Sequence, residues 1–101
     1  MSRKVHLERG IRKLIRKSVS FIKKEIKRKI KKGDSETAMG FVLVEGPAKF
    51  DFSQEDIKKI KENKRIYKKE ISKKLWDAEI TLKFEESSVR IYYVVFIDTT
   101  A

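Results

Sequence analysis

The chain has 101 residues and a formal net charge of +11, which comes from 26 Lys and Arg against 15 Asp and Glu. This length suits a single domain over residues 1–101, and the absence of Cys excludes disulfide scaffolds and Cys-ligated zinc. No stretch approaches the roughly 18 consecutive apolar residues of a membrane-spanning helix.

Residues 5–32 are predicted to form one long amphipathic helix, because apolar residues recur at steps of three and four. Residues 1–32 carry a net charge of +12 and residues 33–101 a net of −1, so the whole basic excess lies in the first third of the chain. The face opposite the apolar residues, which we call the basic arc, is interrupted only by Ser20. The basic arc consists of Arg9, Arg12, Lys13, Arg16, Lys17, Lys23, Lys24, Lys27, Arg28 and Lys31.

Two short stretches after this helix are predicted to be strands. Residues 38–45 form an apolar run, and the Gly46-Pro47 pair indicates a turn that closes it. Residues 48–52 alternate between apolar and polar side chains and give the weaker strand prediction.

A second helix is predicted to begin at Ser53, because Ser53 with Asp56 resembles a capping box. Its apolar residues continue in a narrow arc to Leu75. Residues 62–64 supply no apolar anchor, so we expect a kink or a break into two helices there. Its Lys and Arg residues are interspersed with acids, which is typical of a solvated face.

The C-terminal part of the chain predicts an antiparallel hairpin, formed by residues 79–84 and 89–97 around a short polar loop. The element order is therefore α-β-(β)-α-β-β. This order indicates an α+β fold with a long N-terminal basic amphipathic helix, a second helix and a small antiparallel sheet of three to four strands. The hairpin residues expected to be buried are Ile80, Leu82, Ile91 and Val95.

The last strand is apolar on both faces, with Tyr92, Val94 and Phe96 alternating with the residues between them. Either helices cover both faces of the sheet, or a partner covers one of them. The second arrangement implies a homodimer or a protein target that contacts Tyr92, Val94 and Phe96.

Signals for catalysis are weak. His6 is the only His, no Gly-rich phosphate loop is present, and the serines have no plausible base except His6. A His-independent ribonuclease that uses Arg90, Tyr92 and Tyr93 is the remaining chemical alternative, because positioned cations can stabilise phosphoryl charge. We therefore expect no enzyme, no cofactor and no bound metal, and we expect His6→Ala to leave any activity unchanged.

The basic arc instead predicts a nucleic-acid-binding protein of the cytoplasm. Phosphate backbones attract several cations spaced along one surface, and Lys outnumbers Arg in this arc, which favours contacts that are largely independent of base sequence. DNA, RNA or a nucleoprotein complex is the expected partner.

Three other interpretations of the basic arc stay open. They are a solvated Lys-rich face, a membrane-surface helix, and a protein-binding inhibitor or regulator of a nucleic-acid-processing complex. The composition is similar to that of accessory proteins of phages and mobile elements, although no motif is shared.

Overall fold

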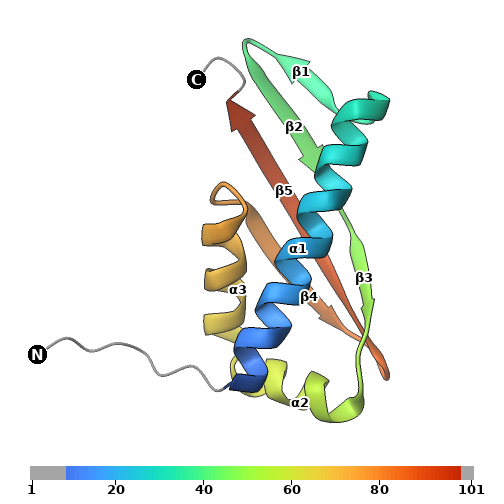
Figure 1. Ribbon diagram of the computed structural model, residues 1–101, viewed down its shortest axis with the longest axis vertical. Helices are drawn as coiled ribbons and strands as arrows, with labels where there is room; N and C mark the ends of the chain where they lie inside the picture. The colour runs from blue at the N-terminus through green and yellow to red at the C-terminus, as the bar shows by residue number, and fades with distance from the viewer. Residues whose placement is uncertain (1–8, 99–101) are drawn as a thin grey trace, which may run out of the picture.

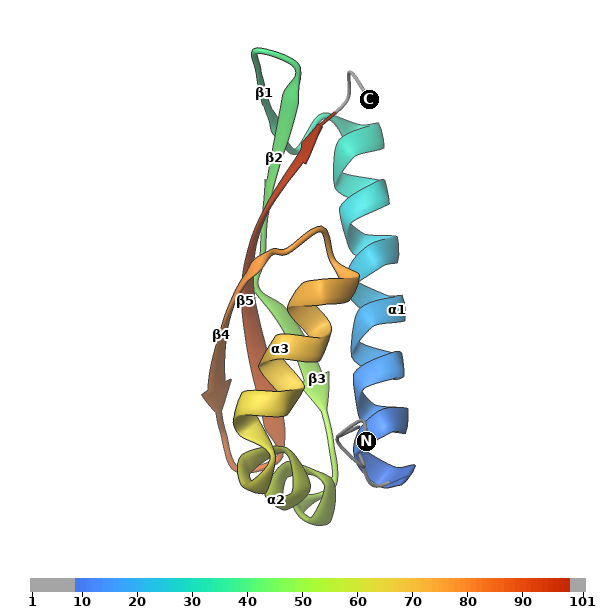
Figure 2. The same ribbon diagram turned by 90° about the vertical axis from the view of Figure 1, so that its left-hand side faces the viewer.

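A computed structural model describes residues 9–98, which form three helices and a five-stranded antiparallel sheet. The helices α1 and α3 lie side by side on one face of the sheet, and α2 lies across one end of it (Figures 1 and 2). The α+β class and the helix-first order are confirmed, with one strand more than the largest number predicted. The elements are α1 (Arg9–Lys32), β1 (Glu36–Ala38), β2 (Phe41–Glu45), β3 (Ala48–Asp51), α2 (Gln54–Glu62), α3 (Lys64–Lys74), β4 (Glu79–Phe84) and β5 (Ser88–Asp98).

The central strand of the sheet is β5, with β4 on one side and both β2 and β3 on the other. The pairs Glu45–Val94 and Ala48–Ile91 share one register, so β2 and β3 are two halves of a single antiparallel partner of β5. The predicted turn at Gly46-Pro47 is therefore wrong. The Gly46 N–H still donates to the Tyr93 carbonyl at 2.9 Å, and Pro47 only removes one donor from the ladder without changing its direction.

A turn that the sequence did not indicate lies between β1 and β2. Met39 and Gly40 both have positive φ angles, 51° and 83°, and Ala38 pairs directly with Phe41 across them. Two central residues with positive φ favour a two-residue hairpin. The predicted strand over residues 38–45 is consequently a turn followed by β2.

The helix boundaries follow the predicted signals. The Ser53 hydroxyl accepts a hydrogen bond from the Asp56 N–H at 3.1 Å, which caps the start of α2. The predicted break is confirmed, because α2 ends at Glu62 and α3 begins at Lys64. Between them, the Asn63 side chain donates to the Lys59 carbonyl at 2.9 Å.

The hydrophobic core lies between the helices and the inner face of the sheet. Ile22 and Ile26 of α1 are fully buried, as are Ile91 and Val95 of β5. Burying such side chains removes apolar surface from water at about 25 cal/mol per Å². The antiparallel hairpin is confirmed, with Ile80 buried, whereas Leu82 is only half-buried beside the core.

One buried polar link joins α1 to α3. The Ser18 hydroxyl donates to the Leu14 carbonyl at 2.8 Å, and its oxygen lies 2.6 Å from the Tyr67 hydroxyl. Because Ser has a single hydroxyl proton, Tyr67 acts as the donor in the second bond. Burial disfavours the phenolate and raises the pKa of Tyr67 to about 12.

Replacing Ser18 with Ala is expected to lower the free energy of unfolding by about 2 kcal/mol, because the buried Tyr67 O–H loses its acceptor. Urea denaturation of the variants checks this value. The double variant Ser18→Ala/Tyr67→Phe should be more stable than Ser18→Ala alone, since neither partner is then left unpaired. A double variant that loses the sum of the two single effects would contradict this account.

Candidate nucleic-acid interface

The basic arc occupies the side of α1 that faces away from the sheet. Its residues from Arg12 to Lys31 are all exposed, and Ser20 is exposed among them. The side chain of Arg9 lies outside the described part of the structure. On the opposite side of the helix, Ile11 and Ile15 are buried. The predicted orientation of the helix is therefore confirmed, and its use in binding stays a prediction. The exposed members are Arg12, Lys13, Arg16, Lys17, Lys23, Lys24, Lys27, Arg28 and Lys31.

The single acid of α1, Glu25, does not neutralise this arc. Its carboxylate accepts a hydrogen bond from the Tyr93 hydroxyl at 2.6 Å and lies 3.6 Å from the Lys29 ammonium. Lys29 in turn donates to the Glu45 carbonyl at 2.5 Å. Burial raises the pKa of Tyr93, and the neighbouring carboxylate raises it further, because a phenolate beside Glu25 would be repelled. These contacts hold the acid against the sheet and leave the arc wholly cationic.

A second basic helix lies beside α1. Acids are interspersed among the basic residues of α2, which has three Lys and three acids, but α3 has only one acid. The break at Asn63 leaves α3 with six Lys and Arg and one acid, Glu70. The Glu70 carboxylate lies 3.6 Å from the Lys74 ammonium and 4.0 Å from that of Lys73. The helical layer therefore carries cations on two neighbouring elements.

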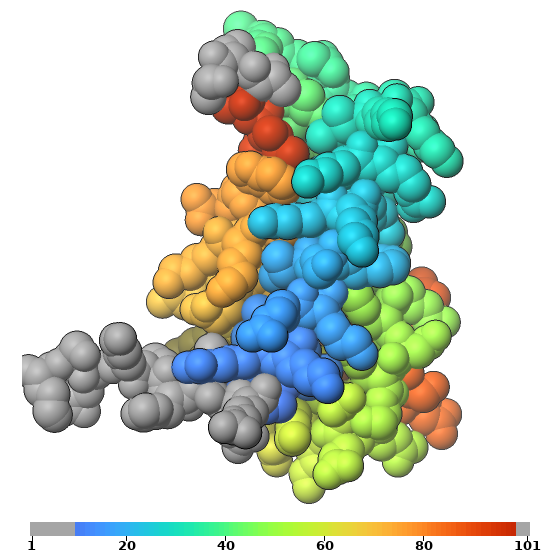
Figure 3. All heavy atoms as spheres, viewed as in Figure 1, coloured from blue at the N-terminus to red at the C-terminus, as the bar shows by residue number. Residues whose placement is uncertain are grey.

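A groove of about 590 Å³ runs between α1 and α3. Its apolar base is Ile15 and Val19. The side chains of α1 project from this face of the molecule next to those of α3 (Figure 3). Cations from both helices meet at this groove, with Glu70 the one acid that lines it. The charged residues along it are Arg12, Arg16, Lys23, Glu70 and Lys74.

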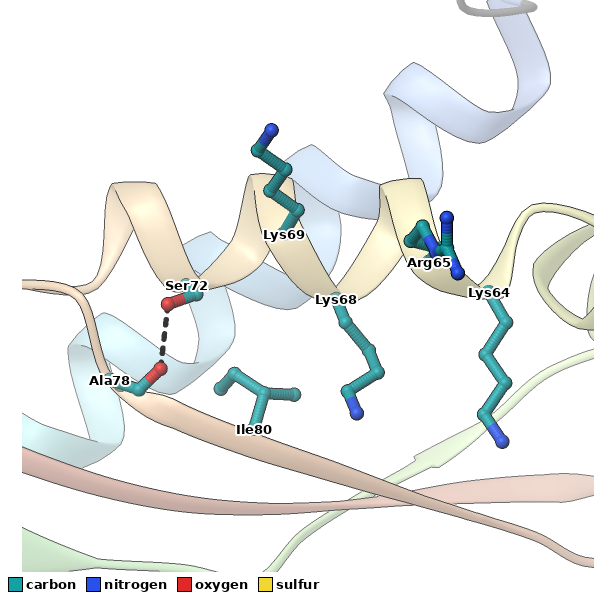
Figure 4. A pocket seen from close by; sticks show the side chains of 7 residues that line it. All are labelled: Lys64, Arg65, Lys68, Lys69, Ser72, Ala78 and Ile80. Carbon is teal, nitrogen blue, oxygen red and sulfur yellow. Dashed lines mark hydrogen bonds between the residues drawn. The ribbon is translucent and has the colours of Figure 1, made fainter.

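A separate groove of about 540 Å³ lies between α3 and β4, and we call it the α3–β4 groove. Lys64 and Lys68 reach down from α3 toward β4, over Ile80 at the base (Figure 4). The Ser72 hydroxyl donates to the Ala78 carbonyl at 2.6 Å and closes one end. Among residues 9–98, no acid lines this groove. All its lining residues are Lys64, Arg65, Lys68, Lys69, Ser72, Ala78 and Ile80.

The opposite face of the sheet, which we call the outer sheet face, is covered by none of the three helices (Figure 2). Phe96 is 61% exposed and Tyr92 is 36% exposed, with Val94 half-buried between them. Of the two predicted arrangements, the structure has the one in which a sheet face stays uncovered. The identity of any partner for this face stays a prediction.

The residues of the ribonuclease alternative do not form one cluster. Arg90 and Tyr92 lie on the outer sheet face, whereas Tyr93 is 1% exposed and points into the core. The Arg90 guanidinium lies 3.6 Å from the Glu85 carboxylate. The pKa of Glu85 is lowered chiefly because the Ser88 hydroxyl donates to that carboxylate at 2.8 Å.

His6 lies outside the described residues. Within residues 9–98, no group of three or more His, Asp or Glu side chains is arranged to hold a metal ion, and no helix is long and apolar enough to cross a membrane. Comparison of the chain with protein-family models, curated proteins and solved structures finds no match.

Proposed function

We propose that this protein is a small non-enzymatic module that binds the nucleic-acid backbone through the basic arc of α1. The observation that supports this proposal most strongly is the uninterrupted exposure of the arc, with Glu25 held against the sheet. From Arg16 to Lys27 the arc extends about 17 Å, at 1.5 Å per residue of helix. That length matches several successive phosphates.

The composition of the arc supports contacts that are largely independent of base sequence. Lys acts as a point charge toward phosphate, whereas the planar guanidinium of Arg has the fork geometry that best matches guanine or phosphate in a bidentate contact. The neighbouring cations of α3 widen the surface toward a second row of phosphates. DNA and RNA both supply such phosphates, and both are found inside the cell. We therefore propose that the protein acts in the cytoplasm.

The salt dependence of affinity tests this proposal. If roughly five phosphates are neutralised, the slope of log affinity against log salt for a random-sequence DNA duplex should be about −4.5. Raising the salt from about 50 to about 200 mM should then weaken binding on the order of 500-fold. Fluorescence anisotropy of a labelled duplex measures both values, and an uncharged peptide nucleic acid of the same sequence is the control probe. Absence of duplex binding at micromolar protein and low salt would contradict the proposal.

A second candidate function is favoured by the outer sheet face. An apolar surface that includes Phe96 and Tyr92 fits a protein partner, so the chain could act as an inhibitor or regulator of a nucleic-acid-processing complex, of the kind that phages and mobile elements encode. A second copy of the chain is the simplest occupant. Light scattering of the pure protein gives its mass in solution. A monomer leaves the face open to a protein target, whereas a dimer that Tyr92→Ser/Phe96→Ser converts to a monomer, with duplex binding unchanged, means that a second copy occupies it.

A further inference from the structure

The edge of the sheet formed by β4 is open on one side, because β4 pairs only with β5 among residues 9–98. The Glu85 N–H donates to the Ser88 carbonyl at 2.9 Å, so these two residues form a hydrogen-bonded pair of the ladder. Hydrogen-bonded and non-hydrogen-bonded pairs alternate along antiparallel strands. Counting back along β4, the main-chain N–H and C=O groups of Ile80 and Leu82 are directed away from β5.

This open edge lies along the α3–β4 groove. The side chain of Ile80 forms the base of the groove, and Lys64 and Lys68 reach toward β4 from the helix above (Figure 4). Lys64 also lies 6.0 Å from the centre of the Phe84 ring, which places its charge beside the far end of β4. The open edge of β4 at Ile80, an apolar base and the cations of α3 therefore border one groove.

We propose that the α3–β4 groove binds an acidic peptide segment in extended conformation, added to the sheet as a further strand beside β4. Strand addition gives the main-chain groups of Ile80 and Leu82 hydrogen-bonding partners. Alternate peptide side chains then point toward α3, and these are the carboxylates that reach Lys64 and Lys68 over the apolar base. The intervening apolar side chains point to the outer sheet face. The proposal is independent of nucleic-acid binding by α1.

The charges of the groove favour this occupant over two others. A second copy of the chain would bring its own α3, with six cations and one acid, against the first, and like charges repel. Phosphodiesters can contact the lysines but cannot form the alternating main-chain ladder with β4. An acidic peptide can form ion pairs with the lysines and main-chain hydrogen bonds with the open edge of β4.

The probe for this site is a peptide of about eight alternating Glu and Val residues, acetylated and amidated, which is long enough for one strand. On titration into the full-length protein, followed by nuclear magnetic resonance, amide hydrogen exchange at Ile80 and Leu82 is expected to slow as binding saturates. A Lys-Val peptide of the same length is the charge control and should not bind. A Glu-Val peptide with every peptide nitrogen methylated keeps the charge but has no main-chain N–H groups, so it should bind more weakly without protecting these amides.

Two variants with the same change in charge separate this site from the basic arc. Lys64→Glu/Lys68→Glu is expected to lower the affinity for the Glu-Val peptide about tenfold or more, since two ion pairs become repulsive. Lys23→Glu/Lys24→Glu should leave the affinity for the peptide unchanged and lower the affinity for the DNA duplex. Equal losses of peptide affinity from both variants, or peptide binding without protection of Ile80 and Leu82, would overturn the proposal. Protection of these amides by a DNA duplex instead of the peptide would also overturn it.

Discussion

Replacing Lys23, Lys24 and Lys27 with Glu is expected to abolish duplex binding at physiological salt without unfolding the protein. All three side chains are exposed on α1, so the core beneath them is unchanged. Removing three phosphate contacts should reduce the slope of log affinity on log salt from about −4.5 to about −1.8. Anisotropy measured across a salt series gives the slope, and thermal unfolding gives the stability of the variant.

The matched control reverses Lys49, Lys58 and Lys83, which are exposed on β3, α2 and β4. This variant has the same change in net charge on parts of the molecule away from the basic arc. Its affinity should fall far less, and its slope should stay close to that of the unaltered chain. Equal losses in the two triple variants would mean that the affinity reflects the total charge of the protein and no defined surface.

Replacing Gly46 with Ala is expected to lower the free energy of unfolding by about 3 kcal/mol. A Cβ at this position would overlap the Tyr93 ring, which is itself buried and donates to Glu25. Overpacking of a filled core costs about 1–3 kcal/mol, and displacing the ring also strains a charge-assisted hydrogen bond. Guanidinium denaturation at neutral pH measures the loss.

Two further variants identify the cause of this loss. Gly33→Ala is the control for backbone strain, because Gly33 has a φ of +80° and open space around it, and it should cost only about 1 kcal/mol. Gly46 does not have a positive φ, so the loss of stability in Gly46→Ala comes from the contact with the Tyr93 ring alone. Gly46→Ala should therefore lower the free energy of unfolding less when position 93 is Leu than when it is Tyr. If the methyl costs the same with Leu at position 93, the ring contact is not responsible.

Elements with a strong local signal could be predicted from the sequence. The steps of three and four along α1 determine which side is buried, and the capping interaction of Ser53 with Asp56 is complete within four residues. The break at Asn63 follows from the missing apolar anchor. In contrast, Met39 has no sequence preference for the positive φ that it adopts, so the hairpin before β2 gave no signal beyond Gly40.

The features that depend on distant contacts were predicted wrongly or not at all. Gly46-Pro47 has the sequence of a turn, but register with β5 carries the strand through it. For the site, exposure of the basic arc follows from the period of a single helix and could be predicted. The α3–β4 groove could not, because it also requires the placement of β4 at a sheet edge, and no local pattern in the sequence specifies that placement.

The separation of charge between the helical layer and the sheet affects how the protein is oriented when it approaches a polyanion. Residues 33–53 hold four acids and one Lys, and residues 75–98 hold five acids and two bases, so the strands and their turns are net acidic beneath a strongly cationic helical layer. The molecule therefore has an electric dipole directed across its short dimension. If the protein binds nucleic acid as proposed, this dipole orients the helices toward the polyanion before contact and speeds productive encounters at low ionic strength. Every bound copy would then present Tyr92 and Phe96 outward, so that a coated strand becomes a surface of aromatic side chains available to other proteins.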